Sequence, residues 1–335
     1  MGRRRLTQRQ RARIARLQEE RRRRLQERLE ARLEAAGDQP AREGRVVRRH
    51  GQNLLVRDAD GSEHHCLFRQ NLGEIVCGDQ VLWQPLHDGQ GVVVALLPRR
   101  SVLVRADYNG QEKPLAANLT QLVVVVAPRP EPAGYLTDQY LVAAERMGVK
   151  AMLVLNKMDL PAPEERDAFL QRFAHYQTIG YPVVPVSANT GQGLAALQER
   201  LAGETSILVG QSGVGKSSLI NALLPHRPEA VGDLSPASGL GRHTTSAATL
   251  HQLAGGGEII DSPGVRSFRP GRLDRRDLEA GFREFQPFLG RCRFSNCSHR
   301  QEPGCALREA VERGEIHPQR LENFLRMAER LDSRR

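Results

Sequence analysis

The sequence predicts an α/β fold in which three structured domains follow a basic arm. Short alternating runs between turn signals predict a small OB-like β-barrel over residues 44–100. Continuous apolar runs that alternate with helical stretches predict a central domain with a mostly parallel sheet over residues 105–270. A polar helical pattern interrupted by cysteines predicts a separate helical domain over residues 273–335.

The basic arm, residues 1–40, carries most of the net charge. Residues 1–34 hold 13 arginines against 5 glutamates, a balance of +8 within the overall +10. Such a concentration of charge indicates a polyanionic partner. We interpret the arm as a segment that binds RNA phosphates and is disordered when free. A solvated arm without a ligand is the alternative.

Composition also limits the cellular location. The chain has no apolar run long enough to span a membrane, and its N-terminus lacks the apolar core of a secretory signal. Its five cysteines are odd in number, and three of them crowd between Cys292 and Cys305. This pattern indicates a reducing compartment and a bound metal instead of disulfides, so we expect a cytoplasmic protein without a membrane partner.

The barrel is predicted from about five short strands within 55 residues. The pattern suits an oligonucleotide-binding OB-fold and also other small barrels. The runs are Arg45–Arg49, Asn53–Val56, Glu63–Phe68, Gln80–Gln84 and Val92–Leu97.

The central sheet is predicted from five apolar runs that suit parallel strands covered on both faces. These runs are Leu122–Ala127, Ala151–Leu155, Val183–Val186, Ser206–Val209 and Glu258–Ile260.

A phosphate-binding loop follows the fourth of these runs. It matches GxxxxGK[ST] in full and precedes a helical stretch, which is the context that a P-loop requires. Backbone N–H groups and the helix N-terminus would hold the phosphates, Lys216 would reach the β- and γ-phosphates, and Ser217 would bind Mg²⁺. The loop consists of Gly210, Gln211, Ser212, Gly213, Val214, Gly215, Lys216 and Ser217, with Ser218 following in the helix.

Two further motifs specify guanine. Asn156, Lys157, Met158 and Asp159 match NKxD after a predicted strand. The Asp159 carboxylate would accept two hydrogen bonds from the guanine edge, whereas adenine offers no such donor pair. Asn156 would brace the phosphate loop, and the stem of Lys157 would cover the base. The segment Ser187-Ala188-Asn189 resembles the second guanine element, whose backbone N–H meets the O6 atom.

The switch elements lie after the phosphate loop. Asp261 and Gly264 bound a DxxG motif, in which Asp261 would hold Mg²⁺ through water and Gly264 would sense the γ-phosphate. Either Thr244 or Thr245 would supply the remaining Mg²⁺ hydroxyl. The residue after DxxG is Val265, which cannot orient water as the usual glutamine does. His243 is therefore our candidate for that role, with a surface histidine as the alternative and Arg242 as a weaker candidate.

The order of the motifs predicts a circularly permuted G domain that binds and hydrolyses GTP. Ordinary G domains run from phosphate loop to switch threonine, DxxG, NKxD and SA. Here NKxD and SA come first, yet the cyclic order is kept. All motifs still follow strands at their carboxyl ends, where such sheets bind ligands.

The cysteine cluster predicts a structural zinc site. Cys292, Cys297, His299 and Cys305 lie within fourteen residues. Three thiolates and one imidazole fill a tetrahedral Zn²⁺ shell and leave no open position. Unligated cysteines are the alternative, and the cysteines of the barrel are expected to be ordinary buried residues.

Together these residues resemble the ribosome small-subunit-dependent GTPase A family of bacteria. The resemblance covers nearly the whole chain: the basic tail, the barrel, the permuted motifs, the Gly241–Thr245 stretch and the cysteine cluster. It implies a cytoplasmic factor in late assembly of the small ribosomal subunit that contacts its rRNA. It further implies slow intrinsic GTP hydrolysis stimulated by the subunit, structural zinc, and a role in hydrolysis for the histidine matching His243.

Two other functional classes share some of these features. One is a binding protein in which GTP acts as a timer for docking on RNA, and the other is an ATP-dependent P-loop enzyme, which Asp159 disfavours. We expect a monomer that exchanges GTP and GDP.

Overall fold

The computed structural model describes residues 39–86, 90–106, 111–224, 248–262 and 274–332. These residues form two compact units. The first holds the described residues up to Ile75 together with Asp79–Pro98, and the second holds Val76–Gly78 and the residues from Arg99 onward.

The first unit is a five-stranded barrel, as predicted. Its strands follow the order β1-β2-β3-β5-β4, and β4 returns to pair with β1. A bulge in β1 between Val46 and Arg48 helps this long strand to pair with two neighbours. The strands are β1 (Arg42–His50), β2 (Asn53–Arg57), β3 (Glu63–Phe68), β4 (Gln80–Pro85) and β5 (Gly91–Leu96), with a 3-10 helix at Gln70–Leu72.

Trp83 occupies the centre of the barrel core and is 1% exposed. A Cβ atom at Gly91 would lie 2.6 Å from its ring, so glycine is required there. Cys66 is buried in the same core, as expected for a cysteine without a chemical role.

The second unit contains the α/β sheet, in the order β10-β9-β8-β11-β13-β12. These neighbours pair in parallel, except that β12 runs antiparallel to β13. The strands are β8 (Gln121–Val126), β9 (Lys150–Leu155), β10 (Val183–Pro185), β11 (Thr205–Val209), β12 (Thr249–Gln252) and β13 (Glu258–Asp261). A separate hairpin, β6 (Val102–Ala106) and β7 (Glu112–Ala117), precedes them.

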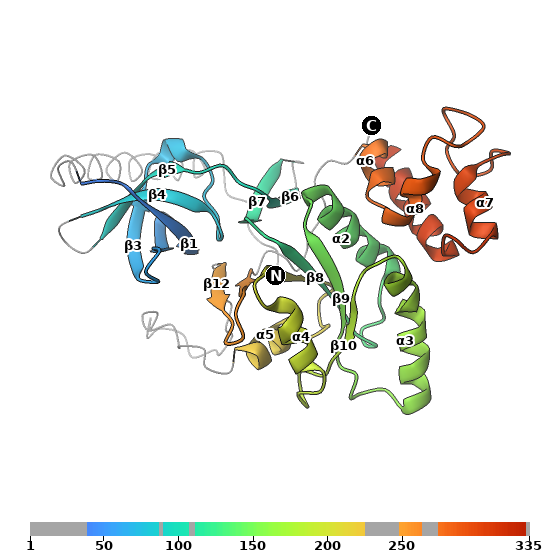
Figure 1. The fold of residues 1–335 in the computed structure, drawn as a ribbon, viewed down its shortest axis with the longest axis horizontal. Helices are drawn as coiled ribbons and strands as arrows, with labels where there is room; N and C mark the ends of the chain where they lie inside the picture. The colour runs from blue at the N-terminus through green and yellow to red at the C-terminus, as the bar shows by residue number, and fades with distance from the viewer. Residues whose placement is uncertain (1–38, 87–89, 107–110, 225–247, 263–273, 333–335) are drawn as a thin grey trace, which may run out of the picture. The chain divides into compact units, whose positions relative to one another are not determined.

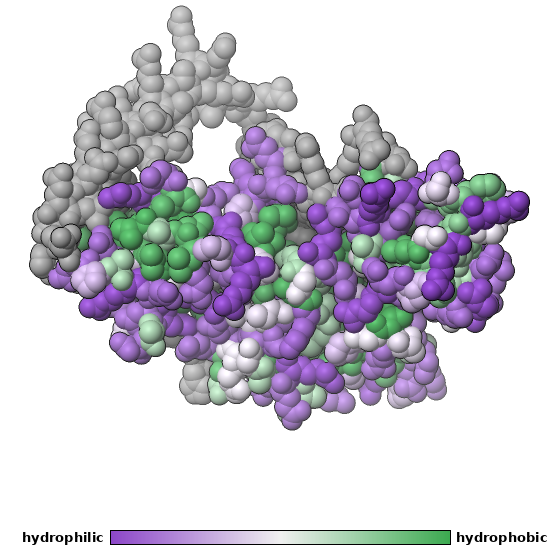
Figure 2. Space-filling view, turned by 45° about the horizontal axis from the view of Figure 1, so that its top comes forward, coloured by the Kyte–Doolittle hydropathy of each residue, from purple (hydrophilic) through white to green (hydrophobic). Residues whose placement is uncertain are grey.

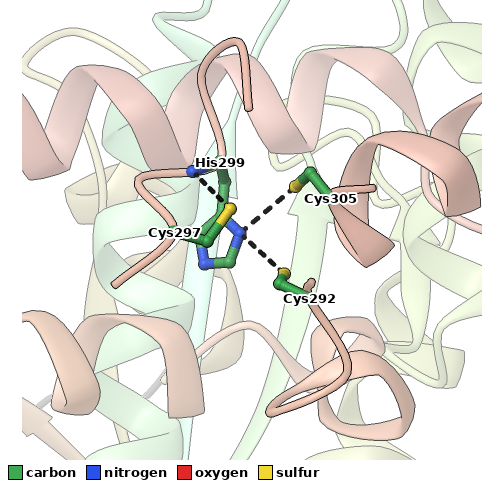
Figure 3. A group of neighbouring side chains, drawn as sticks. All are labelled: Cys292, Cys297, His299 and Cys305. Atoms are coloured by element: carbon green, nitrogen blue, oxygen red, sulfur yellow. Dashed lines mark hydrogen bonds between the residues drawn. The ribbon is translucent and has the colours of Figure 1, made fainter. Parts of the chain in front are cut away.

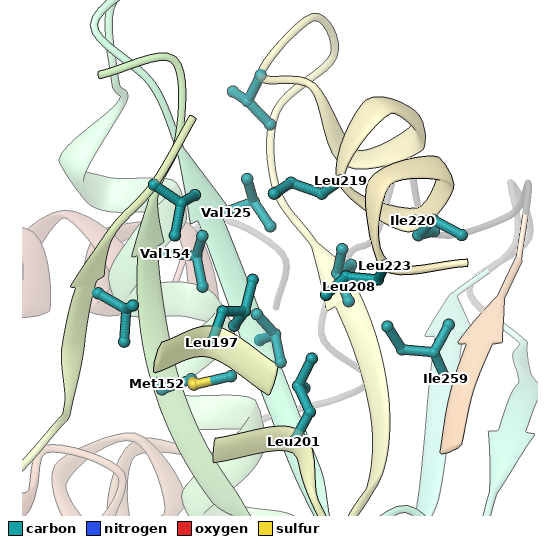
Figure 4. Packing of buried hydrophobic residues seen from close by; sticks show 14 of the residues in the cluster. Val125, Met152, Val154, Leu197, Leu201, Leu208, Leu219, Ile220, Leu223 and Ile259 are labelled. Atoms are coloured by element: carbon teal, nitrogen blue, oxygen red, sulfur yellow. The ribbon is translucent and has the colours of Figure 1, made fainter. Parts of the chain in front are cut away.

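Helices cover both faces of this sheet (Figure 1). Helices α2 (Gly134–Met147) and α3 (Pro163–Thr178) lie on one face, and α4 (Leu194–Leu201) and α5 (Lys216–Leu223) on the other. Figure 4 shows Leu197, Leu219 and Leu223 of the second pair packed against strand residues such as Val154. Strands β9 and β10 lie on one side of β8, whereas β11 lies on its other side. The connections that follow β8 and β11 therefore run to opposite faces of the sheet. Such a point is where open α/β sheets bind ligands.

The C-terminal region is helical, as predicted. It comprises α6 (Arg275–Ala280), a 3-10 helix at Arg283–Phe288, α7 (Ala306–Glu312) and α8 (Pro318–Asp332). The side chain of Asp274 caps α6 by accepting from the Asp277 backbone N–H at 2.7 Å. The apolar core of this C-terminal region includes Phe282, Phe285 and Phe324. It also includes Val142 of α2, so the C-terminal helices pack directly on the α/β domain.

Hydrophilic residues cover most of the described surface on the face shown in Figure 2, and hydrophobic ones form small separate patches. Among the described residues, no helix has the length and apolar character needed to cross a bilayer.

Candidate nucleotide site and metal centre

The phosphate loop joins β11 to α5, and its glycines are required by its geometry. Gly210, Gly213 and Gly215 have φ values of 143°, 86° and 92°, which residues with a side chain rarely adopt. A Cβ atom at Gly210 would lie 2.2 Å from the Val125 carbonyl oxygen. At Gly215 it would lie 2.4 Å from Nδ2 of Asn156. The loop therefore keeps close to the neighbouring strand ends.

The interior of the loop is organised by two side chains. Val214 is 1% exposed and belongs to the core of the sheet, so it anchors the loop from below. The ammonium of Lys216 donates to the carbonyl oxygens of Gly210 and Gln211 at 2.7 and 2.8 Å. Ser212, Ser217 and Ser218 are exposed, so their hydroxyls are accessible to a ligand.

Asn156 connects the phosphate loop to both guanine elements. Its Nδ2 donates to the Val214 carbonyl at 2.9 Å, and its Oδ1 accepts from the Ala188 N–H at 3.1 Å. Its neighbour Lys157 has a positive φ of 64°, and its ammonium donates to the Gly213 carbonyl at 2.6 Å. The stem of Lys157 therefore lies beside the loop.

Asp159 and Ser187 also lie together. The Ser187 hydroxyl donates to Oδ1 of Asp159 at 2.7 Å, and Asn189 donates to Oδ2 at 3.5 Å. The Ser187 hydrogen bond is the main cause that lowers the pKa of Asp159, which keeps the carboxylate ionised at neutral pH. Met158 differs from its neighbours, because its side chain is 3% exposed and packs inward.

Asp261 ends β13, which pairs in parallel with β11. The DxxG aspartate is therefore the last residue of the strand beside β11, from which the phosphate loop begins. The remaining predicted switch residues, His243, Thr244, Thr245 and Gly264, lie outside the described residues, as do Arg242 and Val265.

A small hollow lies between helix α2 and the phosphate loop. Its walls include Leu136 and Tyr140 of α2 and Gly210, Gln211 and Val214 of the loop. Tyr140 and Gly210 line this hollow together, and burial raises the pKa of Tyr140 to about 12 while the Gly210 backbone acts in the opposite direction. Sequence reasoning missed Tyr140, because its position in an apolar helical stretch gives no signal of contact with the loop.

The four residues of the cysteine cluster converge (Figure 3). One ligand atom from each of Cys292, Cys297, His299 and Cys305 lies within 4.8 Å of all the others. His299 Nδ1 is 3.5 Å from the Cys292 sulfur and 3.4 Å from the Cys305 sulfur. Three thiols and an imidazole at this spacing could hold a metal ion.

Glu279 supports the cluster from α6 and was also missed from the sequence. Its carboxylate lies 3.4 Å from Nε2 of His299 and accepts from Arg275 at 3.2 Å. A carboxylate on the second imidazole nitrogen is one of the common partners that orient a metal-binding histidine. Its spacing from the cluster in sequence gives no motif, so only the packing of α6 reveals it.

Comparison with known proteins identifies the family. The profile described as RsgA GTPase matches residues 96–270. The chain belongs to the RsgA GTPase family. It is 47% identical over 327 residues to the small ribosomal subunit biogenesis GTPase RsgA of Pseudomonas aeruginosa, covering 97% of this chain and 96% of that protein. It is 49% identical to the protein of the same name from Chromohalobacter salexigens, with both chains fully covered.

Solved structures agree with this membership and with the permuted fold. YjeQ from Thermotoga maritima is 35% identical, with a TM-score of 0.73, and is matched over 88% of this chain and 100% of that chain. YloQ, described as a circularly permuted GTPase, is 26% identical with a TM-score of 0.69, over 88% of this chain and 96% of that chain. The fold class predicted from motif order is confirmed, and the chain is a GTP-hydrolysing enzyme of this family.

Proposed function

We propose that this protein hydrolyses GTP to GDP and phosphate during late maturation of the small ribosomal subunit, and that the subunit stimulates turnover. The observation that carries the proposal is the convergence of Asn156 with the phosphate loop and the second guanine element. The relatives named as small ribosomal subunit biogenesis GTPases support the choice of partner. Release of the protein would follow hydrolysis.

Guanine selection is assigned to Asp159, whose ionised carboxylate would accept from N1–H and the 2-amino group. The backbone N–H of Ala188 would meet O6, and Lys157 would cover the base. Backbone N–H groups of the loop between Gly210 and Ser218 would hold the phosphates at the start of α5. The ammonium of Lys216 would give up its hydrogen bonds to the loop carbonyls and bind the β- and γ-phosphates instead.

Hydrolysis requires charge stabilisation and an oriented water. Mg²⁺, when bound, neutralises phosphate charge, and Ser217, Asp261 and one of Thr244 and Thr245 would hold it. Gly264 would sense the γ-phosphate. Because Val265 cannot orient water, we assign that role to His243, which suits a reaction that is slow until a partner places the switch.

The metal of the C-terminal cluster is proposed to be one structural zinc ion per chain. In a tetrahedral site with ordinary Zn–N and Zn–S lengths, the nitrogen and sulfur atoms lie about 3.6 Å apart. The corresponding separations of 3.5 and 3.4 Å fit this value closely. Four protein ligands leave no open position, so the ion would stabilise the fold and take no part in hydrolysis.

The remaining proposals concern partners and location. The arginine-rich arm would bind rRNA phosphates, in keeping with its +8 balance. A monomer acting in the cytoplasm, where the subunit is assembled, is the simplest arrangement.

The test is phosphate release from GTP with and without purified small ribosomal subunits. We expect turnover to rise steeply with the small subunit and to stay low with the same concentration of large subunits. Equal rates in all three conditions would contradict the proposal. If the subunit stimulates turnover but the protein leaves the subunit without hydrolysing GTP, the alternative is favoured, in which GTP binding alone controls docking on RNA.

A further inference from the structure

A buried charged network joins the C-terminal helices to the α/β domain. Arg320 of α8 is fully buried, and it donates to Asp138 Oδ1 of α2 at 2.5 Å. It also donates to both carboxylate oxygens of Glu284 at 2.5 and 3.0 Å. Asn323 donates to the second oxygen of Asp138 at 2.7 Å, and Tyr176 of α3 donates to the first at 2.7 Å.

This network fixes the position of α2 against α8. Both oxygens of Asp138 have partners, and Asp138 and Arg320 are each 0% exposed. A shift of α8 along α2 would leave a buried charge without its partner, which is strongly unfavourable. The two hydrogen bonds between Arg320 and Glu284 also restrict the relative orientation of the two groups, because bidentate pairing adds geometric specificity.

The opposite side of α2 contacts the phosphate loop. Tyr140 lies two residues after Asp138, which places it about 200° further around the helix. Its side chain is 2% exposed and lines the same hollow as Gly210 and Gln211 of the loop, with the Gly210 backbone close to its hydroxyl. Gly210 is also one of the two residues whose carbonyl accepts from Lys216. Helix α2 therefore connects Arg320 on one side with the loop on the other.

We propose that Arg320 and Tyr140 are positioning residues for the phosphate loop and act through α2. Arg320 holds the helix in place through Asp138, and Tyr140 transfers that position to Gly210. The inference rests on the proposed nucleotide site and adds to it a contribution from the C-terminal domain. Loss of either residue is expected to loosen nucleotide binding without removing a group that touches the nucleotide.

The test measures how fast a fluorescent N-methylanthraniloyl-GDP leaves the full-length, zinc-loaded protein. Tyr140→Phe removes only a hydroxyl, and Arg320→Met removes the charge while keeping an unbranched apolar stem. We expect dissociation to be about three- to tenfold faster in each. In the double variant the rate should not exceed that of the faster single variant, because both residues act along one connection.

A matched control separates positioning from general loss of stability. Leu307→Ala creates a cavity in the same C-terminal core. Leu307 belongs to α7, which contributes no residue to the charged network. The substitution should lower the midpoint of thermal unfolding yet leave the dissociation rate of the GDP analogue unchanged. If Arg320→Met fails to fold, Asn323→Ala removes one hydrogen bond of Asp138 and leaves the charges paired, and it should also accelerate dissociation.

Lys216→Ala distinguishes the two ways in which the idea can fail. This inference alone is overturned if Tyr140→Phe and Asn323→Ala release the GDP analogue at the wild-type rate while Lys216→Ala binds it clearly more weakly. Wild-type binding in Lys216→Ala overturns the proposed phosphate site and this inference with it. Multiplied effects in the double variant show two independent structural roles and also contradict the connection through α2.

Discussion

Lys216 shows how the role of a single side chain follows from its surroundings. Its ammonium lies within the loop, held by two carbonyl groups of the loop itself. We expect Lys216→Ala to lower GTP turnover by at least about 100-fold, because a charge that stabilises the transferred phosphoryl group is removed. Phosphate release measures the effect. Lys113→Ala on β7 is the control and should keep wild-type turnover, and a near-normal rate in Lys216→Ala would contradict the assignment.

His175 predicts how stability responds to acid. Burial, with His317 and Arg320 close by, lowers the pKa of His175 to about 4, while Glu284 acts in the opposite direction. In the unfolded chain His175 therefore binds a proton near pH 6.5, whereas in the folded protein it binds one only near pH 4. Stability is lost as the pH falls through this window, by at most about 2 kcal/mol between pH 7.5 and 5.

Urea unfolding of the wild type and of His175→Gln at these two pH values tests the point. The variant should lose less stability than the wild type on going to pH 5, because glutamine does not titrate. Equal losses in the two proteins would mean that His175 is protonated in the folded state as readily as in the unfolded one.

At the scale of elements, patterns of burial predicted most of the fold. The five barrel runs and the five parallel runs match the observed strands closely, because each strand has a simple burial pattern. Strand β12 was not predicted, since Thr249–Gln252 has only four residues and half of them are not buried. The hairpin of β6 and β7 was also not predicted, because a proline and charged residues interrupt its second strand.

The site was predicted as far as local motifs extend. The NKxD and P-loop residues could be found because each motif is continuous in sequence and follows a strand. Tyr140, Glu279 and Arg320 could not, because their significance arises from contacts between elements that only folding brings together. Residues within a continuous motif can therefore be predicted from the sequence, whereas residues that hold the motif in place from other elements cannot.

The C-terminal element is expected to depend on its metal. We predict about one zinc per chain by elemental analysis, and loss of zinc in Cys297→Ala. The variant should lose the thermal transition of the C-terminal helices, because metal binding can supply roughly 10–16 kcal/mol toward folding such a small unit. Cys66→Ala in the barrel should keep its zinc. A protein that remains fully folded after chelation would contradict a structural site.

For the whole molecule, the arm and the G domain are expected to divide the work. Deleting residues 1–34 removes a balance of +8 and none of the nucleotide motifs. Intrinsic turnover should stay nearly unchanged, while turnover stimulated by the small subunit should fall at moderate salt. The log–log salt dependence of binding should become shallower by roughly 0.7–0.9 for each rRNA phosphate that the arm would otherwise neutralise.

His243→Ala is the complementary variant. It should still bind the subunit, yet its stimulated rate should stay low even when the subunit is saturating, because the chemical step is impaired. Saturating subunit should instead restore most of the rate of the arm deletion. If both variants keep an equally low rate at saturation, the arm takes part in activation and the division of work is wrong.

The central claim is that loops in permuted order build one guanine-specific site, and nucleotide preference tests it most directly. The measurement compares the dissociation constants of GDP and xanthosine diphosphate for the wild type, Asp159→Asn and the control Asp167→Asn, which makes the same change at an exposed carboxylate of α3. Asp159→Asn should weaken GDP by at least about 100-fold and strengthen the xanthosine nucleotide, whose 2-oxo group needs a donor. Asp167→Asn should keep the preference for GDP. An equal loss of both nucleotides in Asp159→Asn would show a merely structural residue and contradict the claim.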